Sequence, residues 1–203
     1  MSVRNWPRYG VASFNWTLMP QAIAFKGAFG SQALETGSPR WEVSLTGIHQ
    51  KHIKSLEIQR FIESLGGFRH QLALYHLLQP VPRGTLRGSP EVAVLASRGA
   101  TALTLDAGAA QANRTLLAGD YIGVGANLTQ QVLRLDADAI ADAAGIITVQ
   151  LATPLRNDFN VGSAVVWDKP TALFRQRELS TGINFIPKFG QPWSLNLLED
   201  WRP

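Results

Sequence analysis

The sequence predicts a mainly β protein with one helix, in which a small β-barrel is inserted into a larger sandwich-like or barrel-like β domain. Most segments alternate apolar and polar residues, or are short and bounded by Gly and Pro, as strands are. Only one segment has a helical apolar stripe. The composition also changes inside the chain: residues 92–167 hold 17 of the 24 alanines, but only Tyr121, Phe159 and Trp167 among the 18 aromatic residues.

The charge changes at the same boundaries. Residues 92–167 contain four Arg and six Asp, a net charge of −2, whereas residues 1–91 sum to +5 and residues 168–203 to +1. Such shifts indicate separate cores. We therefore expect residues 1–91 and 168–203 to form one discontinuous β-rich domain, and residues 92–167 to form the inserted barrel.

The first 40 residues carry many aromatic side chains between Pro and Gly residues. This pattern predicts short strands and loops, which could form an arm that docks elsewhere. The segment Arg40–Thr46 then alternates strictly and places Trp41, Val43 and Leu45 on one face. We expect a strand there.

One helix is expected from about Ile53 to Leu65, because its apolar residues follow helical spacing and Gly66-Gly67 supplies a C-terminal stop. Alternation resumes over Phe68–Leu78, which predicts a strand. The segment Pro80–Pro90 contains three prolines and two glycines in eleven residues, so that it reads as a linker or a long surface loop.

The inserted module contains short strand candidates separated by turn signals, an arrangement typical of a small barrel or sandwich. They are Val92–Ala96, Ala102–Leu105, Asp120–Val124, Gln131–Leu135, Ile146–Leu151 and Ala164–Trp167. The segment Asp136–Ala144 is compatible with a helical turn, because Ala favours helix, and equally with a hairpin. After the module, we expect a strand at Ala172–Arg175 and another near the C-terminus, pairing back with the first domain.

Composition excludes several classes of function. The chain has no cysteine, so it has neither disulfides nor thiolate zinc sites. Its net charge of +4 comes from scattered bases, and its charged fraction of 17% is low, which disfavours specific nucleic-acid binding. There is no signal-peptide pattern and no apolar run long enough to span a bilayer, so we expect a soluble protein made in the cytosol.

The sequence contains no recognisable set of catalytic residues. The four histidines, His49, His52, His70 and His76, lack the carboxylates that would complete a metal site. We therefore interpret them as structural or solvated.

Two further segments have only a superficial likeness to binding motifs. Asp136, Asp138 and Asp142 lack the Gly and Glu positions of a calcium loop. Residues 119–125 are glycine-rich but lack the Lys-Ser/Thr of a phosphate loop. We expect no enzyme activity, no cofactor and no metal.

A set of motifs recurs in order along the module. They are Leu116–Val124 with its Gly-Asp strand, Gln130–Leu135, an acidic turn ending at Gly145, Ile147–Arg156 with its Pro-Leu-Arg end, Val161–Val165, and Lys169–Arg175 with its Pro-Thr-Ala-Leu-Phe-Arg end. This order resembles a recurrent domain of bacteriophage tail proteins. The flanking Trp-Glu-Val-Ser-Leu strand, helix and Gly-Gly-Phe are similar to the distal tail, or tail-tip, proteins of long-tailed phages. The resemblance covers roughly residues 40–200.

The resemblance implies a structural virion protein at the phage tail tip or baseplate. It implies a β-rich domain that assembles into a ring, as a hexamer, and joins the tail tube protein to hub and fibre proteins, with the inserted barrel projecting outward. The positive flanks would be compatible with a channel through which DNA passes.

Four tryptophans are candidates for the assembly interface: Trp6, Trp16, Trp193 and Trp201. Tryptophan is also a common core residue, and this alternative stays open at the level of sequence. The main alternative function is a carbohydrate- or oligonucleotide-binding β module. An enzyme such as a wall hydrolase ranks third, because no pair of carboxylates stands out.

Overall fold

The computed structural model describes residues 2–7, 9–27, 30–48, 52–178, 185–186, 189–190 and 192–200. The chain divides into two compact units, one formed by Met1–Leu74 with Leu173–Asp200, and the other by Tyr75–Ala172. The first unit is therefore discontinuous in sequence. Its boundaries with the second unit lie between residues 74 and 75 and between residues 172 and 173. The change in composition had predicted them between residues 91 and 92 and between residues 167 and 168.

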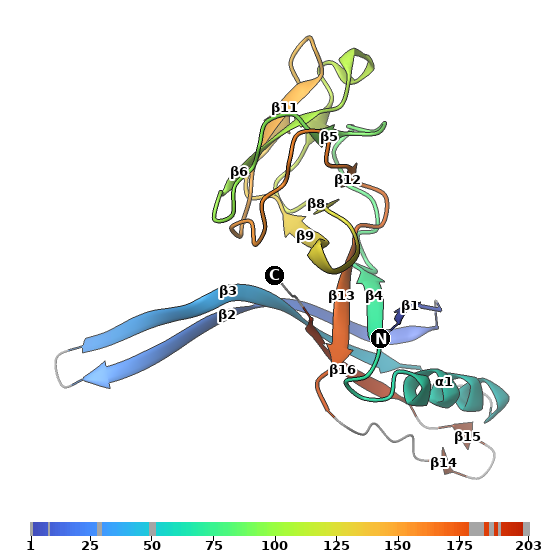
Figure 1. The fold of residues 1–203 in the computed structure, drawn as a ribbon. Coiled ribbons are helices and arrows are strands. Elements are labelled where there is room, and N and C mark those ends of the chain that lie inside the picture. Colours follow the sequence, from blue (N-terminus) through green and yellow to red (C-terminus); the bar gives the residue numbers. More distant parts are fainter. Residues whose placement is uncertain are drawn as a thin grey trace. The chain divides into compact units, whose positions relative to one another are not determined.

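The first unit is built on a six-stranded sheet of order β1-β4-β13-β16-β3-β2 (Figure 1). The strands are Val3–Asn5 (β1), Val11–Gly27 (β2), Gly30–Gly47 (β3), Gln71–Tyr75 (β4), Thr171–Gln176 (β13) and Ser194–Glu199 (β16). β1 is parallel to β4, and β16 is antiparallel to both β13 and β3. The strand near the C-terminus thus pairs with the N-terminal part of the chain, as predicted, with Leu195 opposite Leu45.

The core of the first unit follows the alternation of β3. Trp41, Val43 and Leu45 are each no more than 1% exposed, while the residues between them are half-buried. On the neighbouring strand β16, Leu195 and Leu197 are fully buried with the same period of two. Because successive side chains of a strand point to opposite faces, this period places one face of the sheet against the core. The predicted strand and its inward face are confirmed.

The one α-helix among the described residues is α1, His52–Ser64. It buries Ile58 and Ile62, and the chain leaves it through Gly66 and Gly67, both with left-handed φ angles of 58° and 62°. Residues with a Cβ atom rarely adopt this conformation, so the pair of glycines ends the helix as predicted. A small hairpin, Phe185–Ile186 (β14) with Phe189–Gly190 (β15), also belongs to this unit.

Two predictions for the first unit were wrong in extent. Residues 1–40 were expected as short strands and loops, but they contain β2 and most of β3, of 17 and 18 residues. Pro20 does not interrupt β2, because β2 is an edge strand and the ladder shifts its register there. The strand expected over Phe68–Leu78 is shorter, Gln71–Tyr75, and leaves Phe68 and Leu78 exposed.

The second unit contains two three-stranded antiparallel sheets. One has the order β11-β6-β5 and the other β12-β8-β9. Their strands are Glu91–Val92 (β5), Ala102–Asp106 (β6), Tyr121–Val124 (β8), Gln131–Arg134 (β9), Ile146–Gln150 (β11) and Val165–Val166 (β12). Each of the six strand candidates of the module overlaps a strand, but of Val92–Ala96 only Val92 lies in β5, and of Ala164–Trp167 only Val165–Val166 forms β12.

Single bridges link both edges of these sheets. Glu91 pairs with Ala164 beside β12, and Leu135 pairs with Leu151 at the ends of β9 and β11. The six strands thus enclose one apolar core, which includes Leu105, Ile122 and Val149. None of the sheets formed by the described residues closes into a barrel by continuous pairing. The expected barrel is therefore corrected: the module consists of two sheets that only isolated bridges join into a barrel-like arrangement.

The acidic segment Asp136–Ala144 contains no helix. Ala139–Ile140 (β10) pairs instead with Thr115–Leu116 (β7). Of the two alternatives for this segment, a helical turn or strand pairing, the structure shows strand pairing. Asp142 closes the following turn, since its carboxylate accepts hydrogen bonds from the amides of Ala144 and Ile146 at 2.8 and 2.9 Å. Two short 3₁₀ helices, Ala109–Gln111 and Asn127–Thr129, complete the unit.

The expected linker at Pro80–Pro90 is a surface loop held by one buried carboxylate. Asp120 is fully buried and accepts hydrogen bonds from the amides of Arg83 and Gly84 at 2.9 and 3.0 Å. It also accepts one from the amide of Leu117 at 2.9 Å. These bonds make the loop part of the second unit, which is why the unit begins before residue 92.

Candidate functional site: a hairpin arm

A long β-hairpin extends beyond the rest of the sheet in the first unit (Figure 1). β16 pairs with β3 over Glu42–Thr46, so the part of β3 before residue 40 has β2 as its one strand partner among the described residues. The register shifts between Met19 and Gln21, at the point where this pairing with the body of the sheet has ended. We call residues 21–27 and 30–37 the arm.

The two faces of the arm differ in chemistry. Ile23 lies directly opposite Leu34, and Phe25, two residues on, points to the same face. These three side chains are 50%, 58% and 56% exposed, respectively. On the other face Ala24 lies opposite Ala33, and the remaining positions of that face are small or charged. One face of the arm therefore gathers three large apolar side chains, whereas the other carries small and charged ones.

The arm has little within its own unit to stabilise it. All its described residues except Gln21 are exposed. An isolated two-stranded hairpin is only marginally stable in water, and a long exposed edge strand is a template for further pairing. Large apolar side chains gathered on such an element mark a surface that another protein covers. The arm is thus the strongest candidate for an assembly contact.

A second exposed apolar surface lies on α1. Ile53 and Leu56, one helical turn apart, are 72% and 39% exposed. The buried residues Ser55, Ile58 and Ile62 face the interior of the unit. An amphipathic helix normally directs such apolar residues inward. The outward pair is therefore a second candidate contact.

The predicted interface tryptophans have different places in the fold. Trp6 and Trp193 are 7% and 2% exposed, and their rings pack together with centroids 5.7 Å apart. Trp16 is half-buried on β2, where its ring packs against Trp41 at 5.7 Å and Phe174 at 5.2 Å. Trp201 lies outside the described residues. The burial of Trp6 and Trp193 favours the alternative that they are core residues, and a role in assembly stays a prediction.

Sequence reasoning missed the apolar residues of the arm. Their signal was present in the alternation of Ala-Ile-Ala-Phe-Lys over residues 22–26, between Pro20 and Gly27. Alanines in the alternate positions gave weak polar contrast, and the flanking Pro and Gly suggested loops. The pairing partner, residues 30–37, has no clear alternation of its own, so the hairpin could not be recognised from one strand.

The two histidines whose side chains the structure describes lie in separate surroundings. The ring of His76 stacks on Tyr121 with centroids 4.7 Å apart, and its Nδ1 accepts a hydrogen bond from the amide of Gln79 at 3.1 Å. Burial lowers the pKa of His76 and raises the pKa of Tyr121. The side chain of His70 lies 2.8 Å from the hydroxyl of Ser2. The positions of His49 and of the His52 side chain lie outside the described residues.

The other suspected motifs have structural roles. Asp138 accepts a hydrogen bond from the amide of Ala118 at 2.7 Å, and Asp142 holds its turn. The glycine-rich residues 119–125 include the buried strand β8. Among the described residues, no group of three or more His, Cys, Asp or Glu side chains could hold a metal ion.

A membrane-crossing helix would need greater length and hydropathy than any helix in the described part of the chain has. Comparison of the sequence with protein-family models and with curated proteins finds no match.

Proposed function

We propose that this chain is a structural virion protein of a bacteriophage tail tip, whose copies form a closed ring that joins the tail tube to hub and fibre proteins. The observation that carries the assembly role is the arm, with Ile23, Phe25 and Leu34 exposed on one face. The resemblance of residues 40–200 to distal tail proteins supports the place in the virion. The protein works by assembly and not by catalysis.

Closure of a ring requires two different and complementary patches on each subunit. The apolar face of the arm supplies one patch, and the Ile53–Leu56 surface of α1 supplies the other. The arm contains only Lys26 and Glu35 as charged residues, so burying it against an apolar helix face leaves few charges to desolvate. A contact of this kind is heterologous, and repetition around an axis produces a ring, which the resemblance implies to be a hexamer.

The test of assembly is the mass of the full chain in solution over a concentration series. The wild type should form one discrete closed oligomer, and the double variant Ile23→Asp with Phe25→Asp should be monomeric. Ile140→Asp is the matched control, because Ile140 is 67% exposed but lies in the second unit. The control should assemble as the wild type does. A wild type that stays monomeric at every concentration would contradict self-assembly.

The place in the virion needs a separate test. Antibody labelling of purified phage particles should mark a single position at the end of the tail. Absence of the protein from purified particles would overturn the tail-tip assignment, whatever its oligomeric state.

The basic flanks suggest a lumen that tolerates DNA. Residues 1–91 and 168–203 together carry +6, from +5 and +1. If DNA contacts these charges inside the ring, retention of DNA by the assembled protein should fall steeply as salt rises. Weak salt dependence would count against this hypothesis.

A further inference from the structure

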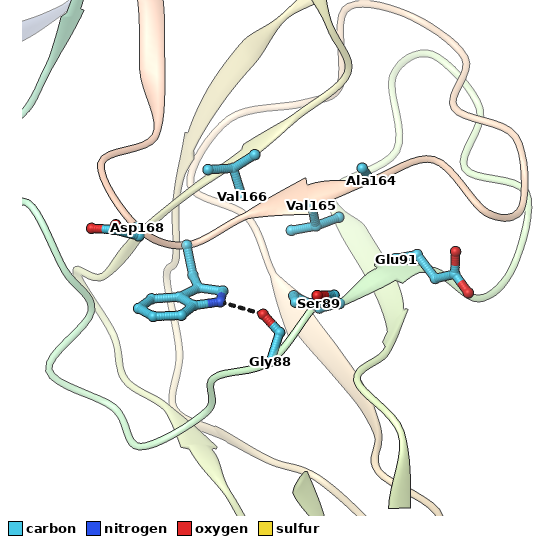
Figure 2. A pocket seen from close by; sticks show the side chains of 9 residues that line it. Gly88, Ser89, Glu91, Ala164, Val165, Val166 and Asp168 are labelled. Carbon is cyan, nitrogen blue, oxygen red and sulfur yellow. Dashed lines mark hydrogen bonds between the residues drawn. The ribbon is translucent and has the colours of Figure 1, made fainter. Parts of the chain in front are cut away.

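The second unit has a groove that is independent of the arm. It lies between two extended segments, Gly88–Glu91 and Ala164–Asp168, and has a volume of about 390 Å³ (Figure 2). The segments are held together by the pairing of Glu91 with Ala164 and by the hydrogen bond from the Val165 amide to the Pro90 carbonyl at 2.9 Å. The walls of the groove are therefore fixed by the backbone.

The most informative residue of the groove is Trp167. Its indole Nε1 donates a hydrogen bond to the carbonyl oxygen of Gly88 at 2.8 Å (Figure 2). The guanidinium of Arg87 lies over the ring, 4.9 Å from its centroid. The half-buried ring is thus held from two sides, and Trp167 is one of the residues that line the groove.

Arg87 is itself held in place. Its guanidinium donates to the carbonyl oxygens of Gly84 at 2.8 Å, Leu86 at 2.6 Å and Pro82 at 3.3 Å. The aromatic surface of Trp167 therefore rests on a rigid support. A rigid aromatic side chain can bind a ligand with little loss of conformational entropy.

The charges around the groove select the ligand. Glu91 and Asp168 lie at opposite ends of it, and no basic side chain is among its lining residues (Figure 2). The carboxylate of Asp168 is already paired with Nζ of Lys169 at 3.5 Å, so Glu91 is the carboxylate that remains to disfavour the phosphates of an oligonucleotide. The cation of Arg87 already occupies one face of Trp167, which disfavours a second cation on the ring. A neutral ligand rich in hydroxyl groups fits both conditions, since carboxylates accept strong hydrogen bonds from hydroxyls.

A second hollow of about 310 Å³ shares the lining residue Ala164 with the groove. Its lining offers hydroxyl and amide groups from Thr129, Asn160 and Ser163. Two hollows that share a wall residue along residues 158–168 suit a chain of several units better than a single small molecule.

From these observations we infer that the groove beside Trp167 binds a neutral oligosaccharide, with one sugar unit against the indole and further units extending past Ala164 toward Asn160. This inference does not rest on the proposed assembly, and it chooses the carbohydrate over the oligonucleotide among ligands that small β modules bind.

The test uses the full chain and three neutral probes: cellotetraose, maltotetraose and tetra-N-acetylchitotetraose. Binding is measured by saturation-transfer NMR and calorimetry, with a ten-residue thymidine oligonucleotide and a lysine-rich peptide as counter-probes. At least one tetrasaccharide should bind, and the counter-probes should not. Binding of none of the three tetrasaccharides, or binding of the oligonucleotide or peptide in place of sugar, overturns the inference.

Variants locate the ligand. Trp167→Ala should weaken tetrasaccharide binding by about tenfold or more, as loss of a central aromatic anchor does, and Trp167→Phe should restore part of it. Leu95→Ala is the matched control, because Leu95 is 57% exposed in the same unit but does not line the groove. Asn160→Ala should weaken the tetrasaccharide but not the corresponding disaccharide. Unchanged binding by a Trp167→Ala protein with wild-type thermal unfolding would place the sugar elsewhere and overturn the inference.

Discussion

The amide of Gly47 donates a hydrogen bond to the carbonyl oxygen of Trp193 at 2.7 Å, and the indole of Trp193 covers the same glycine. A Cβ atom at position 47 would lie 1.9 Å from Nε1 of Trp193. The end of β3 therefore needs glycine so that Trp193 can enter the core, where it also meets Trp6. This contact joins the N-terminal and C-terminal parts of the first unit.

Gly47→Ala should destabilise the first unit by about 1–3 kcal/mol, the usual cost of overpacking a filled core. The free energy of unfolding in urea measures this. Gly37→Ala is the control, because the nearest atom to a Cβ there is 3.8 Å away. The double variant Gly47→Ala with Trp193→Leu should lose less than the sum of the two single variants, since the smaller side chain relieves the clash. Strict additivity would contradict the proposed contact.

Asp120→Asn should destabilise the second unit. The buried carboxylate accepts from Leu117 and Gly84 on Oδ2, and from Arg83 and Gln79 on Oδ1. An amide group can replace only one of these oxygens as an acceptor, and each donor left without a partner costs about 1–3 kcal/mol. Hydrogen exchange should accelerate at the amides of Gly84 and Leu117. Asp136→Asn, at an exposed position, should leave exchange and stability unchanged.

The regular parts of the fold could be predicted because burial leaves a record in residue type. Trp41, Val43 and Leu45 alternate because one face of β3 is buried, and Gly66-Gly67 marks the helix end because left-handed backbone needs glycine. The arm left a weaker record. Both of its faces are exposed, and the alternation over residues 22–26 sets large apolar residues against alanine, which gives little polar contrast.

The groove could not be predicted for a different reason. The hydrogen bond that holds the ring of Trp167 joins it to Gly88, 79 residues earlier in the sequence. A lone Trp at the end of a strand has no local pattern that reveals such a partner. Likewise, Asp120 belongs to a Gly-Asp motif, but its role in holding Arg83 and Gly84 depends on a loop 36 residues earlier.

His76 should make stability depend on pH. Burial lowers its pKa from the ordinary value of 6.5, so the unfolded chain takes up a proton at a higher pH than the folded chain does. This contribution to stability is therefore complete above the unfolded pKa and is lost as the pH falls through it toward the folded pKa. Protonation of Nδ1 would also remove the hydrogen bond from the Gln79 amide.

The variant His76→Phe keeps an aromatic ring against Tyr121 but cannot titrate. Between about pH 7.5 and pH 5, its unfolding midpoint should fall less than that of the wild type. The measurement is thermal unfolding at matched ionic strength. Equal slopes for the two proteins would exclude His76 as a source of the pH dependence.

Removal of the arm should separate assembly from folding. Replacing Gln21–Gly37 by Asn-Gly leaves a short hairpin loop between Met19 and Arg40, which already pair in the register of β2 and β3. The buried side chains of β3 all lie beyond this point, at Trp41 and after. The free energy of unfolding should therefore change by no more than about 1 kcal/mol, because the deleted residues bury little apolar surface.

The same deletion should abolish the closed oligomer, as judged by native mass spectrometry, since it removes Ile23, Phe25 and Leu34 together. Sugar binding by the second unit should persist, because none of the groove residues is touched. A deleted protein that unfolds readily would show that the arm supports its own unit. If the deleted protein still assembles, the contact between copies lies on another surface. The deletion also removes the apolar side chains that the monomer exposes to water. The deleted chain should therefore be more soluble than the wild type.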